Sequence, residues 1–203
     1  MKIVAVGMNY LPHIQELKSE IPEEPVLFIK PDSALCSDKQ PFFLPDFSQE
    51  IHYEVELVVK ISRLGKNIAE KFAHRYYDEI TLGLDLTARD LQRNLRARGL
   101  PWEISKGFDQ SAVVGHFIPK NRFENIQQLH FRLDLNGKTV QQDSTAEMLF
   151  GVDRIIAYAS RFFTLKTGDL FFTGTPCGVG PVHKEDHLEA WLEGEKMLHL
   201  RVK

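Results

Sequence analysis

The sequence contains few cysteines and no long apolar run. Its two cysteines, Cys36 and Cys177, lie far apart and in no metal-ligand spacing, which argues against a disulfide framework or a cysteine-based zinc site. No apolar stretch approaches the roughly 18 residues of a membrane-spanning helix. The short apolar stretch at residues 2–7 is too brief for a signal peptide. We therefore expect free thiols in a cytoplasmic protein that has no membrane partner.

Neither sign of charge predominates. The net charge is −3 over 203 residues, so no overall field attracts nucleic acid or an anionic membrane. The one basic stretch, residues 89–98, has no interleaved aromatic side chains, which gives nucleic-acid binding little support. The 43% hydrophobic and 26% charged content is that of an ordinary globular protein. The length, without any repeat or linker, predicts a single domain over residues 1–203.

Hydrophobic periodicity predicts a strand-rich α+β fold. The clearest element is residues 51–61, where every odd position is apolar, which predicts a half-buried strand. Further strands are expected at residues 2–7, 25–30 and 81–86, with a hairpin at 129–142. Helices are expected at residues 67–77, 88–98 (capped by Thr87) and 145–163. Because the helices are few and do not alternate regularly with strands, the pattern favours α+β over a doubly wound sheet.

Three carboxylates form a candidate metal site. Glu54 and Glu56 share one face of their strand because side chains alternate, and Asp85 lies between leucines in another strand. A buried carboxylate without a partner costs on the order of several kcal/mol. Ligands that are all oxygen predict a hard cation, Mg²⁺ before Ca²⁺ or Mn²⁺. The alternatives are a solvated face for the two glutamates, and for Asp85 an ion pair with Arg89 or a backbone cap.

Other polar residues give weaker signals. On helix 88–98, Arg89 and Gln92 come close in sequence to Asp85. The solvated face of this helix is expected to hold Arg93, Arg96 and Arg98. By residue type alone, Lys106 belongs at the surface. The glycine-rich segment 171–180 lacks the ending of a phosphate loop, so it is either a tight turn or a source of backbone N–H groups for a carboxylate.

The segment LPHIQE, residues 11–16, holds an imidazole and a carboxylate at helical spacing. One helical turn places His13 and Glu16 on the same face. The segment is too short to form a stable helix by itself. From these residues alone, a surface histidine and glutamate in a loop is the simpler interpretation.

Seven motifs, taken in order, resemble a known family. They are GMNYLPHIQE, EPVLFIKP, HYEVELVV, GLDLTARDLQ, GLPWEISKGFD, NGKTVQQDSTAEMLF and LKTGDLFFTGTPCGVGPV. Together they resemble the fumarylacetoacetate hydrolase superfamily, and most of all its short branch of acylpyruvases and oxaloacetate decarboxylases. The resemblance extends from Gly7 to about Glu189. Met8 departs from it, because that branch has arginine between the glycine and the asparagine.

This resemblance implies a mixed β-sandwich roll, a Mg²⁺ or Mn²⁺ site and a homodimer. The implied metal ligands are Glu54, Glu56 and Asp85. The implied substrate-binding residues are Arg89, Gln92 and Thr175. The implied catalytic residues are His13, Glu16 and Lys106. The first two of these would lie on a lid, about residues 9–20, that orders when substrate binds.

The implied reaction is hydrolysis of a C–C bond in small 2,4-dioxo acids, the acylpyruvates, to pyruvate and a carboxylate. Glu16 would orient His13 to take a proton from water, and Lys106 would stabilise the departing enolate. A first alternative keeps the site but changes the reaction, with a small dicarboxylate as substrate. It is an oxaloacetate decarboxylase or tautomerase, or a 2-hydroxyhepta-2,4-diene-1,7-dioate isomerase. A second alternative is a non-catalytic protein that binds a metal and a carboxylate, and the His13–Glu16 pair counts against it.

Overall fold

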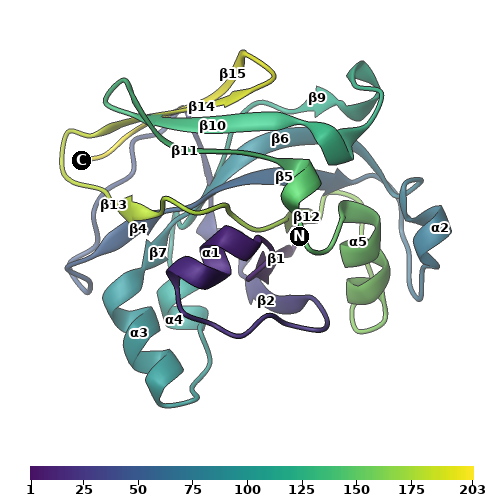
Figure 1. The fold of residues 1–203 in the computed structure, drawn as a ribbon, viewed down its shortest axis with the longest axis horizontal. Helices are drawn as coiled ribbons and strands as arrows, with labels where there is room; N and C mark the ends of the chain where they lie inside the picture. The colour runs from purple at the N-terminus through teal and green to yellow at the C-terminus, as the bar shows by residue number, and fades with distance from the viewer.

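The fold is built on three β-sheets in the structure, a computed structural model that describes residues 1–203 (Figure 1). The largest sheet has the strand order β2-β1-β12-β5-β6-β8-β3, and β9 pairs with β6. Its strands are β1 (Ile3–Gly7), β2 (Val26–Lys30), β3 (Leu35–Ser37), β5 (Val55–Ile61), β6 (Tyr77–Asp85), β8 (Ala112–Val114), β9 (Ile118–Pro119) and β12 (Leu170–Phe172).

Two smaller sheets complete the β-structure. The four-stranded sheet, in the order β11-β10-β14-β15, consists of β10 (His130–Leu135), β11 (Lys138–Ser144), β14 (His187–Leu192) and β15 (Glu195–Arg201). The three-stranded sheet, in the order β13-β4-β7, consists of β13 (Gly180–Pro181), β4 (Ile51–Tyr53) and β7 (Thr87–Ala88). The strand-rich α+β class predicted from the sequence is confirmed.

The chain also forms five short helices. They are α1 (Leu11–Glu16), α2 (Glu70–Ala73), α3 (Arg89–Ala97), α4 (Glu103–Lys106) and α5 (Val152–Ser160). Figure 1 shows α3 and α4 together at one end of the molecule, α2 and α5 at the other, and α1 between them. Single 3₁₀ turns occur at Asp32–Ala34, Lys120–Arg122, Ile126–Gln128 and Thr145–Glu147. None of the helices is long and apolar enough to cross a membrane.

The main hydrophobic core joins the largest sheet to the four-stranded sheet, whose strands β14 and β15 contact β6. Leu57 of β5 and Leu133 of β10 both belong to this core. The opposite face of β5 is also covered, because Val58 packs in a second cluster with Phe172. The prediction of a half-buried strand at residues 51–61 is therefore wrong, since both of its faces are buried.

The helix predictions need two further corrections. Residues 67–77 form only the single turn α2, because Tyr77 already pairs with Ile61 of β5 in the sheet. Thr87 does not cap α3. It lies in β7, and its hydroxyl donates to the carbonyl of Asp85.

The helix predicted at residues 145–163 begins only at Val152. Gly151 precedes it with extended backbone, and Met148 forms a β-bridge with Tyr10. This bridge holds the preceding residues out of the helix. The strands expected near residues 2–7 and 25–30 and the hairpin at 129–142 are confirmed.

Candidate active site

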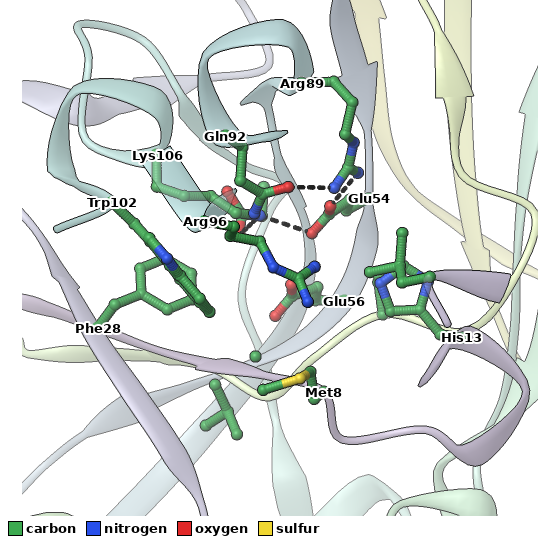
Figure 2. A pocket seen from close by; sticks show the side chains of 15 residues that line it. Met8, His13, Phe28, Glu54, Glu56, Arg89, Gln92, Arg96, Trp102 and Lys106 are labelled. Carbon is green, nitrogen blue, oxygen red and sulfur yellow. Dashed lines mark hydrogen bonds and ion pairs between the residues drawn. The ribbon is translucent and has the colours of Figure 1, made fainter. Parts of the chain in front are cut away.

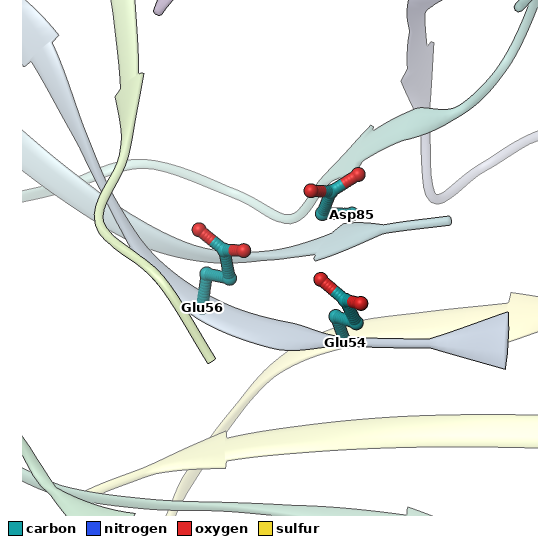
Figure 3. Close-up of side chains that lie close together, drawn as sticks. All are labelled: Glu54, Glu56 and Asp85. Carbon is teal, nitrogen blue, oxygen red and sulfur yellow. The ribbon is translucent and has the colours of Figure 1, made fainter. Parts of the chain in front are cut away.

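The three predicted carboxylates meet on two neighbouring strands. Glu56 lies in β5, Glu54 immediately precedes that strand, and Asp85 ends β6. The strands pair antiparallel with Val55 opposite Leu84, and their apolar alternate residues fix this register. One carboxylate oxygen from each residue lies within 4.8 Å of the others, and all three residues are buried (Figure 3). The alternative of a solvated strand face is therefore wrong.

Lys106, at the end of α4, lies between two of these carboxylates. Its Nζ atom is 2.7 Å from Oδ2 of Asp85 and 2.7 Å from Oε2 of Glu54. It also donates a 2.7 Å hydrogen bond to Oγ1 of Thr87. Burial acts to lower the pKa of Lys106, but the charges of Asp85 and Glu54 outweigh burial and raise it. Lys106 is therefore a fixed cation, and the surface position expected from its residue type is wrong.

Lys30, the last residue of β2, is a second buried lysine at this site, and the sequence analysis missed it. Its Nζ atom lies 2.6 Å from Oδ1 of Asp85. It donates 3.0 Å hydrogen bonds to the carbonyl and hydroxyl oxygens of Ser111, and another to the carbonyl of Lys106. Burial lowers the pKa of Lys30, although the charge of Asp85 opposes the shift. Asp85 thus pairs with two lysines and not with Arg89. The feature of the sequence that could have indicated a buried Lys30 is its position at the end of the apolar strand VLFIK.

Arg89, at the start of α3, pairs with Glu54 instead. Its Nη2 atom donates to Oε1 of Glu54, and its Nη1 atom donates to Oε1 of Gln92. Burial alone would raise the pKa of Glu54, but the charges of Lys106 and Arg89 outweigh it and hold the pKa well below its usual range. Glu54 is consequently ionised, with one oxygen facing each cation.

Glu56 accepts a hydrogen bond from the backbone but forms no ion pair. Its Oε2 atom accepts a 2.6 Å bond from the N–H of Gly174. Burial first, and then the charges of Asp85 and Glu54, raise the pKa of Glu56 well above its usual range. Gly174 has a φ of +97°, and a Cβ there would lie 2.7 Å from Cβ of Asn9. Only glycine can therefore bring its N–H into this position.

The residues present fit a divalent metal ion. Carboxylate oxygens are the ligands that Mg²⁺, Mn²⁺ and Ca²⁺ prefer. Oδ1 of Asp85 is buried and lies 2.6 Å from Nζ of Lys30. Glu56 forms no ion pair, and burial together with the charges of Asp85 and Glu54 raises its pKa. A divalent cation between the three carboxylates would supply the positive charge that Glu56 lacks.

The short helix α1 presents the predicted pair, His13 and Glu16. Pro12 at the start of this helix removes no intrahelical hydrogen bond. Nδ1 of His13 lies 2.9 Å from Oε2 of Glu16, whose Oε1 atom accepts a 3.1 Å bond from the N–H of Gly178. Burial acts to raise the pKa of Glu16, but the bonds from His13 and Gly178 outweigh it and lower the pKa. When Nδ1–H of His13 donates a hydrogen bond to the ionised Glu16, Nε2 of His13 is unprotonated and free to act as a base.

Thr175 is held in the glycine-rich segment 171–180 by a buried glutamine. Nε2 of Gln141 donates a 2.9 Å bond to Oγ1 of Thr175, and Oε1 of Gln141 accepts a 3.0 Å bond from the N–H of Val55. Gln141 therefore ties the segment to the start of β5. Two N–H groups of the segment donate to glutamate side chains, which confirms that it supplies backbone donors to carboxylates.

One cavity joins these side chains (Figure 2). Eight of the nine predicted site residues line it, and the ninth, Glu16, reaches it through His13. Phe28 and Trp102, which the sequence analysis missed, form an apolar wall with their ring centroids 5.9 Å apart. The free volume is about 30 Å³, room for only about two water molecules. The cavity is therefore narrow.

Arg96 departs from its prediction. It was expected on the solvated face of α3, and its side chain is indeed exposed, but it also lines the cavity. Arg93 and Arg98 are exposed as predicted, and Arg93 pairs with Glu50 outside the cavity.

The strand-rich fold thus places a buried carboxylate cluster that could hold a metal ion in one cavity with a histidine from a short helix, as in the active site of an enzyme. The chain belongs to the family described as "Fumarylacetoacetate (FAA) hydrolase C-terminal", which it matches over residues 2–203. It is an enzyme of this family, and the resemblance inferred from the sequence is confirmed. The non-catalytic alternative is therefore set aside.

Two relatives are named oxaloacetate tautomerases. "Oxaloacetate tautomerase FAHD1, mitochondrial" of Mus musculus is 40% identical over 201 residues, covering 99% of this chain and 91% of the relative. "Oxaloacetate tautomerase YcgM" of Escherichia coli strain K12 is 43% identical over 197 residues, covering 97% of this chain and 90% of the relative. Among solved structures, fumarylpyruvate hydrolase from Pseudomonas aeruginosa, in complex with Mn²⁺ and pyruvate, matches with a TM-score of 0.93. The identity is 34%, over 100% of this chain and 89% of that one.

Proposed function

We propose that this protein is a metal-dependent tautomerase that interconverts the enol and keto forms of oxaloacetate. The observation that carries the proposal is a buried three-carboxylate cluster that shares one cavity with His13, itself paired to Glu16. The two relatives named as oxaloacetate tautomerases support the substrate. Keto–enol exchange needs a base at C3 and positive charge near the C2 oxygen.

The proposed metal ligands are Glu54, Glu56 and Asp85, and the proposed ion is Mg²⁺, with Mn²⁺ or Ca²⁺ as alternatives. A divalent cation bound there would hold the 2-oxo acid and polarise its C2 carbonyl. The Mn²⁺ of the Pseudomonas aeruginosa structure supports a divalent metal. The oxygen-only donor set of this chain supports the same choice.

Three further side chains would bind and orient the substrate. All three Nζ hydrogens of Lys106 are donated to protein oxygens, so this lysine contributes its charge. Gln92 accepts from Arg89 through Oε1, which leaves its NH₂ group to donate to a substrate oxygen. Thr175 likewise accepts from Gln141, which leaves its hydroxyl hydrogen to donate to the substrate carboxylate.

His13 would move the proton at C3. In the keto-to-enol direction, Nε2 of His13 takes a proton from C3, and the C2 oxygen takes a proton from water. In the opposite direction, the protonated ring returns its proton to C3, and the enol oxygen releases its proton to water. Glu16 stays ionised throughout, because its pKa is lowered, and it stabilises the charged imidazolium through Nδ1.

Residues 9–20, which contain α1, are proposed to open as a lid. A cavity of about 30 Å³ is too small for a four-carbon diacid, so substrate binding requires side chains or a lining segment such as α1 to move. The segment is anchored at its start, where Asn9 donates to the carbonyls of Phe150 and Thr173 and Tyr10 forms a β-bridge with Met148. Beyond Tyr10, its side chains make two hydrogen bonds to the rest of the chain, between Glu16 and Gly178 and between Ser19 and Arg96. The short helix would therefore move about this anchored start.

Hydrolysis of acylpyruvates, the leading interpretation of the sequence, is not confirmed. The relatives favour the tautomerase alternative instead. Hydrolysis remains the second candidate, because the Pseudomonas aeruginosa relative is named a fumarylpyruvate hydrolase and His13 could equally take a proton from water.

The test compares both reactions on one preparation saturated with Mg²⁺. Loss of the ultraviolet absorbance of enol-oxaloacetate measures tautomerisation, and malate dehydrogenase, which consumes the keto form, verifies the product. Pyruvate release from acetylpyruvate measures hydrolysis. The proposal expects tautomerisation far above the spontaneous rate and the higher kcat/KM. A higher kcat/KM for acetylpyruvate would make hydrolysis the function.

Three broader expectations stay predictions. The family match over residues 2–203 supports one catalytic domain over residues 1–203, which a single cooperative unfolding transition would test. The homodimer is tested by light scattering. The cytoplasmic location is tested by fractionation.

A further inference from the structure

Arg96 is the cation of the cavity that has no carboxylate partner. Lys30 and Lys106 pair with Asp85, and Arg89 pairs with Glu54. Arg96 makes one side-chain hydrogen bond, a 2.8 Å contact from Nη2 to the hydroxyl of Ser19. Figure 2 shows its guanidinium directed into the cavity. Most of its donors are therefore unused by the protein.

The position of Arg96 on α3 places it away from the base of the site. Arg89, Gln92 and Arg96 lie at i, i+3 and i+7, on one face of the helix. Their backbones span about 10 Å along the helix axis. Arg89 contacts Glu54 at the carboxylate cluster. Gln92 lies one helical turn further along α3 and accepts from Arg89, and the exposed Arg96 lies one turn beyond Gln92, nearer to solvent. Arginine side chains on a helix lean toward its N-terminus, so Arg96 leans back toward Gln92.

We propose that Arg96 binds the distal carboxylate of the substrate and makes the enzyme selective for 2-oxo dicarboxylates over 2-oxo monocarboxylates. The inference rests on the proposed function, because it assumes that the 2-oxo acid head lies at the carboxylate cluster. A planar guanidinium matches a carboxylate with two parallel N–H donors. A monocarboxylate would leave this charge at the cavity without a counterion.

Ser19 adds a second consequence. It lies in the proposed lid, and its hydroxyl accepts from the Nη2 atom of Arg96. The second hydrogen of Nη2 and the hydrogens of Nε and Nη1 remain available, so a parallel pair of donors can still bind the substrate carboxylate. A dicarboxylate would therefore fix Arg96 in the orientation that also holds the lid segment.

The test uses two 2-oxo acids that cannot enolise, so that binding is measured without turnover. Difluoro-oxaloacetate carries the distal carboxylate, and trimethylpyruvate carries three methyl groups in its place. Calorimetry with Mg²⁺ is run on the wild type, Arg96→Met and Arg96→Lys. Arg98→Met removes the same charge directly after the same helix, outside the cavity, and serves as the control.

Arg96→Met is expected to weaken difluoro-oxaloacetate binding by about 10- to 100-fold, the usual effect of a hydrogen-bonded charge. Trimethylpyruvate binding should stay within about twofold on the same reasoning. Arg96→Lys should lose less than Arg96→Met, and Arg98→Met should bind both compounds as the wild type does. Equal losses for both compounds, or no loss for either, would overturn the assignment.

Turnover separates this inference from the proposed function. With oxaloacetate, Arg96→Met should raise KM much more than it lowers kcat, because Arg96 touches a part of the substrate that does not react. If the wild type binds difluoro-oxaloacetate through Arg96 but does not tautomerise oxaloacetate, the proposed function fails and the selectivity stands. If it tautomerises oxaloacetate and Arg96→Met leaves KM unchanged, the selectivity fails alone.

Discussion

The Nζ atom of Lys106 lies 2.7 Å from Oδ2 of Asp85, in a contact that both side chains make out of reach of solvent. Removing one partner of a buried pair leaves an uncompensated charge and costs about 3–5 kcal/mol. The lysine therefore supports the structure of the metal-free site as well as contributing charge to the reaction. This dual role leads to the first prediction.

Lys106→Met should lower turnover by on the order of 100- to 1000-fold, by analogy with the loss of one charge-stabilising donor. It should also lower the melting temperature of the metal-free protein, because Asp85 and Glu54 lose a shared cation. Saturating Mg²⁺ should recover part of that loss. Steady-state kinetics and calorimetric melting with and without Mg²⁺ measure both effects. Turnover close to that of the wild type would remove Lys106 from the reaction.

The carboxylate cluster should bind one divalent ion. Glu54→Gln, Glu56→Gln and Asp85→Asn should each weaken Mg²⁺ or Mn²⁺ binding by at least about 10-fold, since even groups that only orient ligands have effects of that size. Isothermal titration measures the affinity. Glu50→Gln is the matched control, because Glu50 pairs with Arg93 and His52 outside the cavity. Unchanged affinity in all three variants would contradict the assignment.

Lys30→Met should destabilise the protein by about 3–5 kcal/mol, because it leaves Asp85 with one cation fewer in the interior. Urea unfolding without added metal measures the change. Lys60→Met is the control, since Lys60 and Glu79 form a pair open to solvent, worth about 0–1 kcal/mol. Similar losses of unfolding free energy in the two variants would show that the buried Lys30–Asp85 pair contributes no more to stability than the exposed pair.

Glu16 should make the stability of the protein depend on acid pH. Its pKa is lowered in the folded state by the bonds from His13 and Gly178, against burial. A group with a lowered folded pKa adds stability above its ordinary pKa, here 4.5, and loses it as the pH falls through the folded value. The difference in unfolding free energy between the wild type and Glu16→Gln should thus be constant near neutral pH and shrink in acid.

The control for this pH series is Glu20→Gln, a change in an exposed residue of the same segment. Its difference from the wild type should stay small across the series. A Glu16→Gln difference that does not change between neutral and acid pH would show that the bonds of Glu16 contribute nothing to stability.

Period-two patterning made the carboxylate cluster predictable. Alternation placed Glu54 and Glu56 on one face, and the leucines around Asp85 indicated burial. Lys30 was missed because a strand that ends in lysine looks like an ordinary edge, and only the neighbouring Ser111 and Asp85 reveal its burial. Pairing across distant segments is not visible in local pattern.

The helices were predicted less well, for a related reason. The segment around Tyr77 has helical composition, yet sheet pairing with Ile61 prevails over local propensity. Arg96 has the composition of a solvated face and is in fact exposed. Its place in the cavity depends on how α3 packs against the sheet, which the sequence does not state.

The central claim is that His13 and the carboxylate cluster together catalyse proton transfer on oxaloacetate. The most direct measurement is the initial rate of enol-oxaloacetate loss with saturating Mg²⁺, for the wild type, His13→Asn and Glu56→Gln. The account predicts a wild-type rate well above the spontaneous one, and a fall of roughly 100- to 10,000-fold in His13→Asn, the usual range for a general base. Glu56→Gln should lose its activity together with its metal. A wild-type rate equal to the spontaneous rate, or full activity in His13→Asn, would contradict the account.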